Sequence, residues 1–381
     1  MTSTLFIGLD GATFTVLDAL TSPDKDGKVT MPFLRHIYEN GVRSKLLSTP
    51  NPLTPPAWVS IMTGRSPGHH GIFDFLRAEE RDGEIYFTLP DARDVRNEMI
   101  WSIASRQGKS FVSLNFPITA PPKGELNGSL IPGFVPWRHL RRNVSPPDLF
   151  DRLKNMSGFE PKELAWDFEQ ESKAVQTLSE NDTENWVTYH TARERQWFQI
   201  AEMLMTEDKP DLMAVMFDGT DKIQHQAWPF LDPELVDNDK SEWAGRMIAH
   251  CKEYFSELDD AIRNLVELVG PDAQVFFASD HGFAASTIQV KINAILHELG
   301  YLGWKQEDTS ESGVRREKAW FANLDWSTTS AYCQTPSSNG ITIRIASRPG
   351  MPGVRPSQYE EFRDTLIADL MTVKADEGKP D

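Results

Sequence analysis

Acidic residues and histidines directly follow three short apolar runs in this chain of 381 residues. They are Asp10 after LFIGL, Asp218, Asp221 and His225 after LMAVMF, and Asp280 and His281 after VFFAS. If the runs are parallel strands of one open sheet, these side chains meet beyond its carboxyl edge, where such sheets bind ligands. Carboxylates together with imidazoles suit zinc or a similar divalent ion. The pattern therefore predicts a metal site at this edge.

The spacing of Asp221 and His225 fits a single helix. The two residues stand four positions apart, so both side chains face the same way if a helix begins there. One Asp after a strand is more often a helix cap or a turn former than a ligand. Three strand ends that carry such residues favour a metal site over that structural interpretation.

Thr54 is the candidate nucleophile. It precedes Pro55 and Pro56, and proline is favoured in the first helical turn, which predicts Thr54 as the N-cap of a helix through Ala57–Met62. A phosphate there would meet free backbone N–H groups and the positive end of the helix dipole. Coordination to a divalent metal can convert the weakly nucleophilic hydroxyl into an alkoxide. The structural alternative is that Thr54 is a plain capping residue, and the metal cluster favours the nucleophile over it.

Strands and helices alternate along most of the chain. Apolar runs rich in β-branched residues predict buried parallel strands at Leu5–Leu9, Phe111–Leu114, Leu212–Phe217 and Val275–Ala278. Helical patterns lie at Pro32–Asn40, Asn97–Arg106 and Ser241–Val269. This alternation is typical of an α/β fold with a doubly wound, mostly parallel sheet.

The stretch from Pro117 to His190 breaks the alternation and is rich in proline, tryptophan and charge. We expect residues 117–190 to form an inserted region. It would be either a cap that selects substrates or a peripheral subdomain without substrate contact. Residues 1–116 and 191–381 would then form the α/β core.

The composition fits a globular protein, with 39% hydrophobic and 25% charged residues. A formal net charge of -17 argues against nucleic acid or an anionic membrane as partner. It leaves room for a small phosphorylated substrate, because bound cations reverse the local sign. We expect a cytoplasmic protein, since neither a signal peptide nor a membrane-spanning run is evident. Cys251 is expected to be a buried thiol, and the oligomeric state stays open.

Four motifs resemble, in this order, those of the type I phosphodiesterase/nucleotide pyrophosphatase group of the alkaline phosphatase superfamily. They are GLDGA, LTPPAWVSIMTG with PGHHGI, FDGTDKIQH and SDHGF. The resemblance implies two zinc sites, one formed by Asp10, Thr54, Asp280 and His281 and one by Asp221 and His225. It also implies phosphoester hydrolysis by in-line displacement through a phospho-threonine intermediate. Sulfatases of the superfamily use a C/S-x-P-x-R nucleophile motif, and neither cysteine here lies in one.

Two features depart from the pattern of this family. Members place a further histidine near the C-terminus on the second metal, but His297 is the last histidine here. We therefore expect an incomplete C-terminal end and a second metal held weakly by Asp221 and His225, with Asp218 or water. Asp74 stands where nucleotide-cleaving relatives often have an asparagine that contacts phosphate. Asp74 is thus the candidate substrate-binding residue, and nucleotides are disfavoured as substrates.

The leading prediction is a hydrolase, either a phosphodiesterase or a phosphatase, that uses two divalent ions. The same residues are compatible with a phosphonate hydrolase or phosphomutase of the same superfamily. In a different class, the chain would be a catalytically weak relative that binds a phosphorylated ligand, and the missing histidine favours that alternative.

Overall fold

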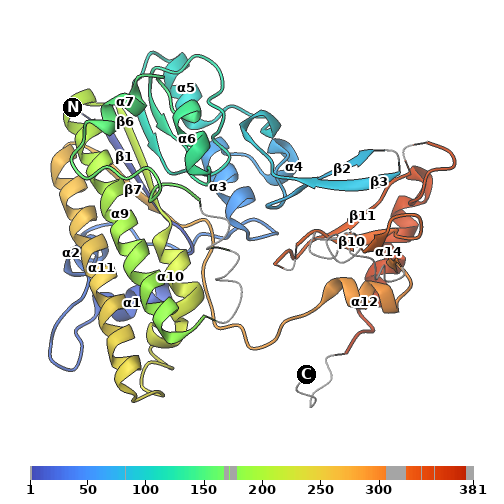
Figure 1. The fold of residues 1–381 in the computed structure, drawn as a ribbon. Coiled ribbons are helices and arrows are strands. Elements are labelled where there is room, and N and C mark those ends of the chain that lie inside the picture. Colours follow the sequence, from blue (N-terminus) through green and yellow to red (C-terminus); the bar gives the residue numbers. More distant parts are fainter. Residues whose placement is uncertain are drawn as a thin grey trace. The chain divides into compact units, whose positions relative to one another are not determined.

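The computed structural model describes residues 2–81, 83–166, 171, 178–305, 323–335, 337–346 and 348–374. Contacts divide the chain into two compact units, whose elements are labelled in Figure 1. Unit 1 consists of Met1–Phe73 and Pro90–Ala285, and unit 2 of Asp74–Leu89 and Ser286–Asp381.

A five-stranded parallel sheet forms the centre of unit 1, in the order β5-β4-β6-β1-β7. Its strands are β1 (Thr4–Leu9), β4 (Phe111–Leu114), β5 (Gly128–Ile131), β6 (Leu212–Phe217) and β7 (Gln274–Ala278). β1 lies between β6 and β7, with Gly8 opposite Met216 and Ala278. The four predicted strands are confirmed, but the prediction that all are buried is wrong for the edge strand β7, where Phe276 is half-exposed. The edge strand β5 is an addition that lies within the expected insertion.

Helices cover both faces of the sheet (Figure 1), as a doubly wound fold requires. One layer contains α1 (Phe14–Thr21), α2 (Pro32–Asn40), α9 (Glu180–Asp208), α10 (Gly219–Ala227) and α11 (Glu242–Val269). The other contains α3 (Thr54–Thr63) and α5 (Ile100–Arg106). Side chains alternate along β6: Val215 and Phe217 pack in the first layer, whereas Met216 packs with Trp58 of α3 in the second. The predicted α/β fold class is confirmed.

Local signals explain where the long helix α11 begins and ends. The Ser241 side chain caps the first turn by accepting a hydrogen bond of 3.1 Å from the N–H of Ala244. Gly270, at φ +82°, follows the last turn. Cys251 is buried on the apolar stripe, and both cysteines are free thiols, as expected.

Shorter elements complete unit 1. They are α4 (Pro67–His70), η1 (Ala92–Asp94), α6 (Trp137–Asn143), α7 (Leu149–Lys154) and η2 (Trp228–Phe230). Residues 117–190, expected to be an insertion, supply β5, α6, α7 and the start of α9, and they group with unit 1. Their role as a cap stays a prediction. No helix in the described part of the chain is both long and apolar enough to cross a bilayer.

Unit 2 has a core of its own. Its elements are β2 (Arg77–Arg81), β3 (Glu84–Thr88), α12 (Ile292–Glu298), β8 (Gly303–Trp304), β9 (Leu324–Asp325), β10 (Ala331–Cys333), β11 (Ile341–Ile343), η3 (Pro356–Gln358) and α14 (Tyr359–Leu370). The strands form three two-stranded antiparallel sheets. Phe87 of the β2–β3 hairpin packs against Trp326 and Tyr332, so residues 74–89 join the C-terminal part in one core. The sequence-based prediction placed residues 1–116 and 191–381 in one α/β core. It did not include a division of these residues between two units.

Candidate metal and nucleophile site

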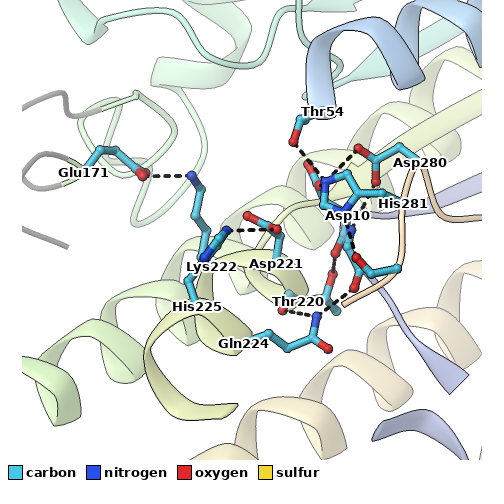
Figure 2. A network of polar contacts seen from close by, with 12 residues as sticks. Asp10, Thr54, Glu171, Thr220, Asp221, Lys222, Gln224, His225, Asp280 and His281 are labelled. Atoms are coloured by element: carbon cyan, nitrogen blue, oxygen red, sulfur yellow. Dashed lines mark hydrogen bonds and ion pairs between the residues drawn. The ribbon is translucent and has the colours of Figure 1, made fainter. Parts of the chain in front are cut away.

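The carboxyl ends of the central strands and the start of α3 bring four predicted residues together (Figure 2). Asp10 directly follows β1, and Asp280 and His281 come shortly after its neighbour β7. Thr54 is the first residue of α3. The three side chains that follow strands are buried or nearly so, which takes the cluster out of bulk water.

The Nε2 atom of His281 lies at the centre of this cluster. It is 3.2 Å from Thr54 Oγ1, 3.5 Å from Asp10 Oδ1 and 3.4 Å from Asp280 Oδ2. The other ring nitrogen, Nδ1, is 2.9 Å from the carbonyl oxygen of Gly282. A proton on Nδ1 satisfies that carbonyl and leaves the Nε2 lone pair directed at the oxygens. A bound cation would satisfy these converging lone pairs together.

Two buried oxygens of the cluster have no hydrogen-bond donor among the described residues: Asp10 Oδ1 and Asp280 Oδ2. The second oxygen of each carboxylate does have one. Trp58 Nε1 donates to Asp10 Oδ2 at 3.3 Å, and the N–H of Gly11 donates to Asp280 Oδ1 at 3.1 Å. Buried acceptors without donors are costly. The free oxygens face His281, so this set of ligand atoms fits a divalent metal.

Electrostatics also favour a cation here. Burial, followed by the charges of Asp280 and Asp221, raises the pKa of Asp10 well above its usual value. Burial raises the pKa of Asp280 to about 6. Burial lowers the pKa of His281, but the charges of Asp280 and Asp221 outweigh it and raise the pKa overall. A divalent ion would relieve the repulsion between these carboxylates.

Asp221 and His225 form a second, smaller set on α10, as their spacing predicts. Their side chains lie 3.4 Å apart, between His225 Nε2 and Asp221 Oδ1. Asp221 is buried, whereas the His225 side chain is 59% exposed and its ring meets Phe283 edge to face at 4.8 Å. Burial raises the pKa of Asp221, but His225 and His281 outweigh it and hold that pKa below its usual range.

The second set offers two candidate ligands, Asp221 and His225, whereas the first offers three in addition to Thr54. Among the described residues, Asp10, Asp280 and His281 are the cluster that brings three ligand atoms within 4.8 Å of one another. The Arg193 guanidinium binds Asp218 Oδ1, so this oxygen is held in a buried ion pair. Participation of Asp218 or water in the second set stays a prediction.

The start of α3 offers fewer free backbone N–H donors than the sequence analysis predicts. The N-cap is Leu53, and Thr54 is the first helical residue. Pro55 and Pro56 carry no N–H, and the N–H of Ala57 bonds to the Leu53 carbonyl oxygen at 3.1 Å. The expectation of several free backbone donors beside Thr54 is therefore wrong. The helix contributes its dipole and at most the N–H of Thr54 itself.

Asp74, the candidate substrate-binding residue, belongs to unit 2. Its buried carboxylate accepts hydrogen bonds from the N–H of Phe75 at 2.6 Å and from the Thr335 hydroxyl at 3.2 Å. The Ser338 hydroxyl bonds to it as well. Asp74 therefore has a structural task within unit 2, and its contact with a substrate stays a prediction.

Three residues that support the site have no place in the sequence-based prediction: Trp58, Asn115 and Arg193. Asn115 directly follows β4 and donates from Nδ2 to Asp218 Oδ1 at 3.2 Å. Asn115 follows its strand as directly as Asp10 follows β1, so amide side chains at strand ends are a sequence signal for this residue. Trp58 and Arg193 lie inside helices with no local signal, and tertiary contact alone identifies them.

Fold and site together define an α/β protein whose strand ends bring two buried carboxylates and an imidazole together beside a threonine hydroxyl. The chain belongs to the type I phosphodiesterase / nucleotide pyrophosphatase family, whose model matches residues 4–380. The comparison with curated proteins gives no match.

Two distant solved structures resemble the chain. One is phosphonoacetate hydrolase from Sinorhizobium meliloti 1021 in complex with phosphonoacetate, at 19% identity and a TM-score of 0.42, covering 78% of this chain and 62% of that protein. The other is a mutant of the alkaline phosphatase PafA, at 13% identity and a TM-score of 0.40, covering 79% of this chain and 71% of that protein. The chain thus spans about 62% of the length of the hydrolase.

Proposed function

We propose that this protein is a metal-dependent phosphoester hydrolase that uses Thr54 as its nucleophile. The observation that carries the proposal is the position of Thr54 Oγ1, 3.2 Å from His281 Nε2 and beside two buried carboxylate oxygens that have no hydrogen-bond donor among the described residues. A hydroxyl next to such a ligand set is suited to attack at phosphorus. Membership of a phosphodiesterase family supports the same reaction class.

Asp10, Asp280 and His281, with Thr54, would hold one metal, for which zinc is the best match to the donors. Asp221 and His225 would contribute to a second. The metal supplies Lewis-acid chemistry: it lowers the pKa of a bound hydroxyl and stabilises charge that develops on phosphoryl oxygens.

The protein residues supply position and charge. The hydroxyl oxygen of Thr54 would form a bond to phosphorus while the bond from phosphorus to the ester oxygen breaks on the opposite side, and the hydroxyl proton would pass through solvent to the leaving oxygen. Water would then attack the phosphorus of the phospho-threonine, release the phosphoryl group and return a proton to Thr54 Oγ1. The dipole of α3 favours negative charge on the phosphoryl group. The hydrogen bond from Trp58 Nε1 holds the Asp10 carboxylate in place while its free oxygen faces the site. These roles fit a small phosphorylated substrate.

Thr54→Ala tests the proposed nucleophile. We expect hydrolysis of a chromogenic phosphodiester or monoester to fall by on the order of 10³-fold or more, because the attacking oxygen is gone. Binding of inorganic phosphate, measured by calorimetry, should remain. Thr63→Ala is the matched control on the same helix: its hydroxyl bonds to the Val59 carbonyl oxygen at 2.6 Å, and its loss should leave turnover unchanged.

The result also separates the alternatives. Wild-type turnover in Thr54→Ala would exclude this nucleophile. A wild-type chain that binds phosphate but hydrolyses no ester would point to the phospho-ligand-binding relative. Turnover of phosphonates or isomerisation of phosphosugars, without ester hydrolysis, would point to the phosphonate hydrolase or phosphomutase. The cytoplasmic location stays a prediction.

Counting metals tests the metal dependence. Elemental analysis of protein purified without chelator, before and after addition of zinc, should give up to two ions per chain. The ion at Asp10, Asp280 and His281 should bind more tightly, because that set offers more ligands. Removal of both ions with EDTA should abolish hydrolysis, and zinc should restore it. Full activity in metal-free protein would contradict the proposal.

A further inference from the structure

Helix α10 carries Asp221 and His225. Two consecutive residues of α9 form hydrogen bonds to the start of α10. These are Arg193 and Glu194, which are buried although both are ionisable. The proposed chemistry uses neither. Buried ionisable side chains are rare unless they are paired, so their contacts should reveal why they are there.

Arg193 joins the ends of two strands to the start of α10. Its guanidinium binds Asp218 Oδ1 and lies 3.4 Å from Asn115 Oδ1. Asn115 follows β4 and donates from Nδ2 to Asp218 and, at 2.9 Å, to the carbonyl oxygen of Met216 in β6. Asn115 has φ +66°, in the left-handed region that asparagine adopts more readily than other residues with a side chain.

Glu194 holds the next residue of the helix. Its Oε1 accepts the backbone N–H of Gly219, the first residue of α10. The contact is close: a Cβ at Gly219 would lie 2.7 Å from Glu194 Oε1 and 2.7 Å from the Tyr254 hydroxyl. A side chain at position 219 would force the Glu194 carboxylate and the Tyr254 ring to move.

The opposite side of α10 is tied to the segment that carries Asp10. The Thr220 hydroxyl donates to the carbonyl oxygen of Asp10, and Gln224 Nε2 donates to that of Gly11 at 2.8 Å (Figure 2). The helix is therefore fixed between α9 and the end of β1. Its position sets the distance between Asp221 and the cluster formed by Asp10, Asp280 and His281.

We propose that Arg193 and Glu194 are positioning residues that complete the second metal site by fixing α10. The pairing of Arg193 with Asp218 has a further effect, since it keeps that carboxylate from competing with Asp221 for an ion. This inference rests on the proposed function. It assigns to α9 the task of holding a metal pair together, as residues behind the ligands do in other metal sites.

The experiment compares the affinities of the two ions. Loss of Arg193 alone would leave Asp218 as an unpaired buried charge, so the variant is the double substitution Arg193→Met with Asp218→Asn. Zinc binding is measured by competition with a chromogenic chelator. We expect the tighter ion to bind as in the wild type and the weaker ion to bind 10- to 100-fold less tightly.

Arg195→Met is the matched control. Arg195 lies on the same helix but is exposed and pairs with Glu257 at 2.7 Å, so both ions should bind as in the wild type. Arg193→Lys keeps the charge but loses the planar guanidinium, and it gives the same comparison if the double variant does not fold. We expect it to weaken the second ion alone.

Three results would overturn the inference. A folded variant that binds both ions like the wild type would show that α9 is structural only. A variant that loses both ions equally would show that Arg193 supports the whole site rather than α10. If the wild-type chain binds only one ion, it has no second site for α10 to position. If it binds no ion, the proposed function itself is contradicted.

Discussion

The carboxylates of Asp10 and Asp280 carry a cost that depends on what they bind. Both are buried, and each keeps one oxygen without a donor among the described residues. Their pKa values are raised, mainly by burial, so the charged forms are disfavoured when no cation is present. A bound metal ion would remove this unfavourable interaction, which strengthens metal binding. Without the ion, the stability of the folded protein depends on the pH.

We expect metal-free protein to lose stability as the pH rises. The pKa of Asp280 is about 6 in the folded chain against an ordinary value of 3.8. Between these values the folded state binds more protons than the unfolded state, so the free energy of unfolding falls with rising pH, by on the order of 3 kcal/mol in total. Urea unfolding of EDTA-treated protein across this range measures the effect.

Asp280→Asn is the control for this prediction. The amide does not titrate, so the variant should show a smaller fall in stability over the same range. Equal pH dependence in the two proteins would mean that Asp280 does not contribute to it. Zinc added to the wild type should reverse the loss above pH 6, because the ion binds the charged carboxylates.

The candidate ligands at the strand ends could be predicted from the sequence. The residues that hold those ligands in place could not. Asp10, Asp280 and His281 come together because the carboxyl ends of adjacent parallel strands meet at one edge. The pairing of Asp218 with Arg193 depends on where α9 packs, which no local pattern encodes. The donors at Thr54 were overestimated because the two prolines that signal the helix also remove its first N–H groups.

At the scale of elements, the contact between β1 and α3 positions Asp10. Gly8 lies in β1, and a Cβ there would be 2.5 Å from Cη2 of Trp58. The missing side chain lets the indole lie against the strand, where its N–H reaches Asp10 Oδ2. One glycine thus allows the helix of the nucleophile to pack against the strand of a metal ligand.

Gly8→Ala should therefore destabilise the protein by about 1–3 kcal/mol, because the added methyl forces Trp58 to shift. Gly245→Ala is the matched control in α11. A Cβ at Gly245 would meet nothing within 4 Å, and the same substitution inside a helix should stabilise by about 0.4–1 kcal/mol. Chemical denaturation of both variants measures the difference. Equal effects of the two substitutions would contradict the close contact at Gly8.

The central strands and long helices were predictable because their patterns are strong. β1, β4 and β6 are apolar runs buried between two helical layers, and β7 is an apolar run at the edge of the sheet that is partly exposed. β5 is only four residues, begins with Gly128 and Ser129, and lies in a stretch rich in proline and glycine. The strands β8 to β11 of unit 2 have two or three residues each, too few for any periodic pattern.

At the scale of the whole molecule, Asp74 belongs to unit 2, whereas the ligand residues belong to unit 1. We expect Asp74→Ala to destabilise unit 2 by about 1–3 kcal/mol, because Thr335 and Ser338 lose a buried acceptor. Metal content should not change. Denaturation monitored by tryptophan fluorescence, together with elemental analysis, measures both quantities.

Asp74→Asn separates this structural role from the predicted contact with substrate. The amide keeps an acceptor oxygen for Thr335 and removes the charge that would repel a phosphate. Faster phosphodiester turnover in this variant would support substrate binding at Asp74. Unchanged turnover with a modest change in stability would assign the residue to unit 2 alone.

The central position of β1 also has a consequence for synthesis of the chain. β1 pairs with β6 on one side and β7 on the other. At about 5–20 residues per second, roughly 10 to 40 s pass between translation of Leu9 and of Leu212. Throughout that interval the apolar segment LFIGL lacks these partners and is exposed to aggregation. We therefore expect the first strand to be the part of the central sheet that most needs shielding from other chains during synthesis.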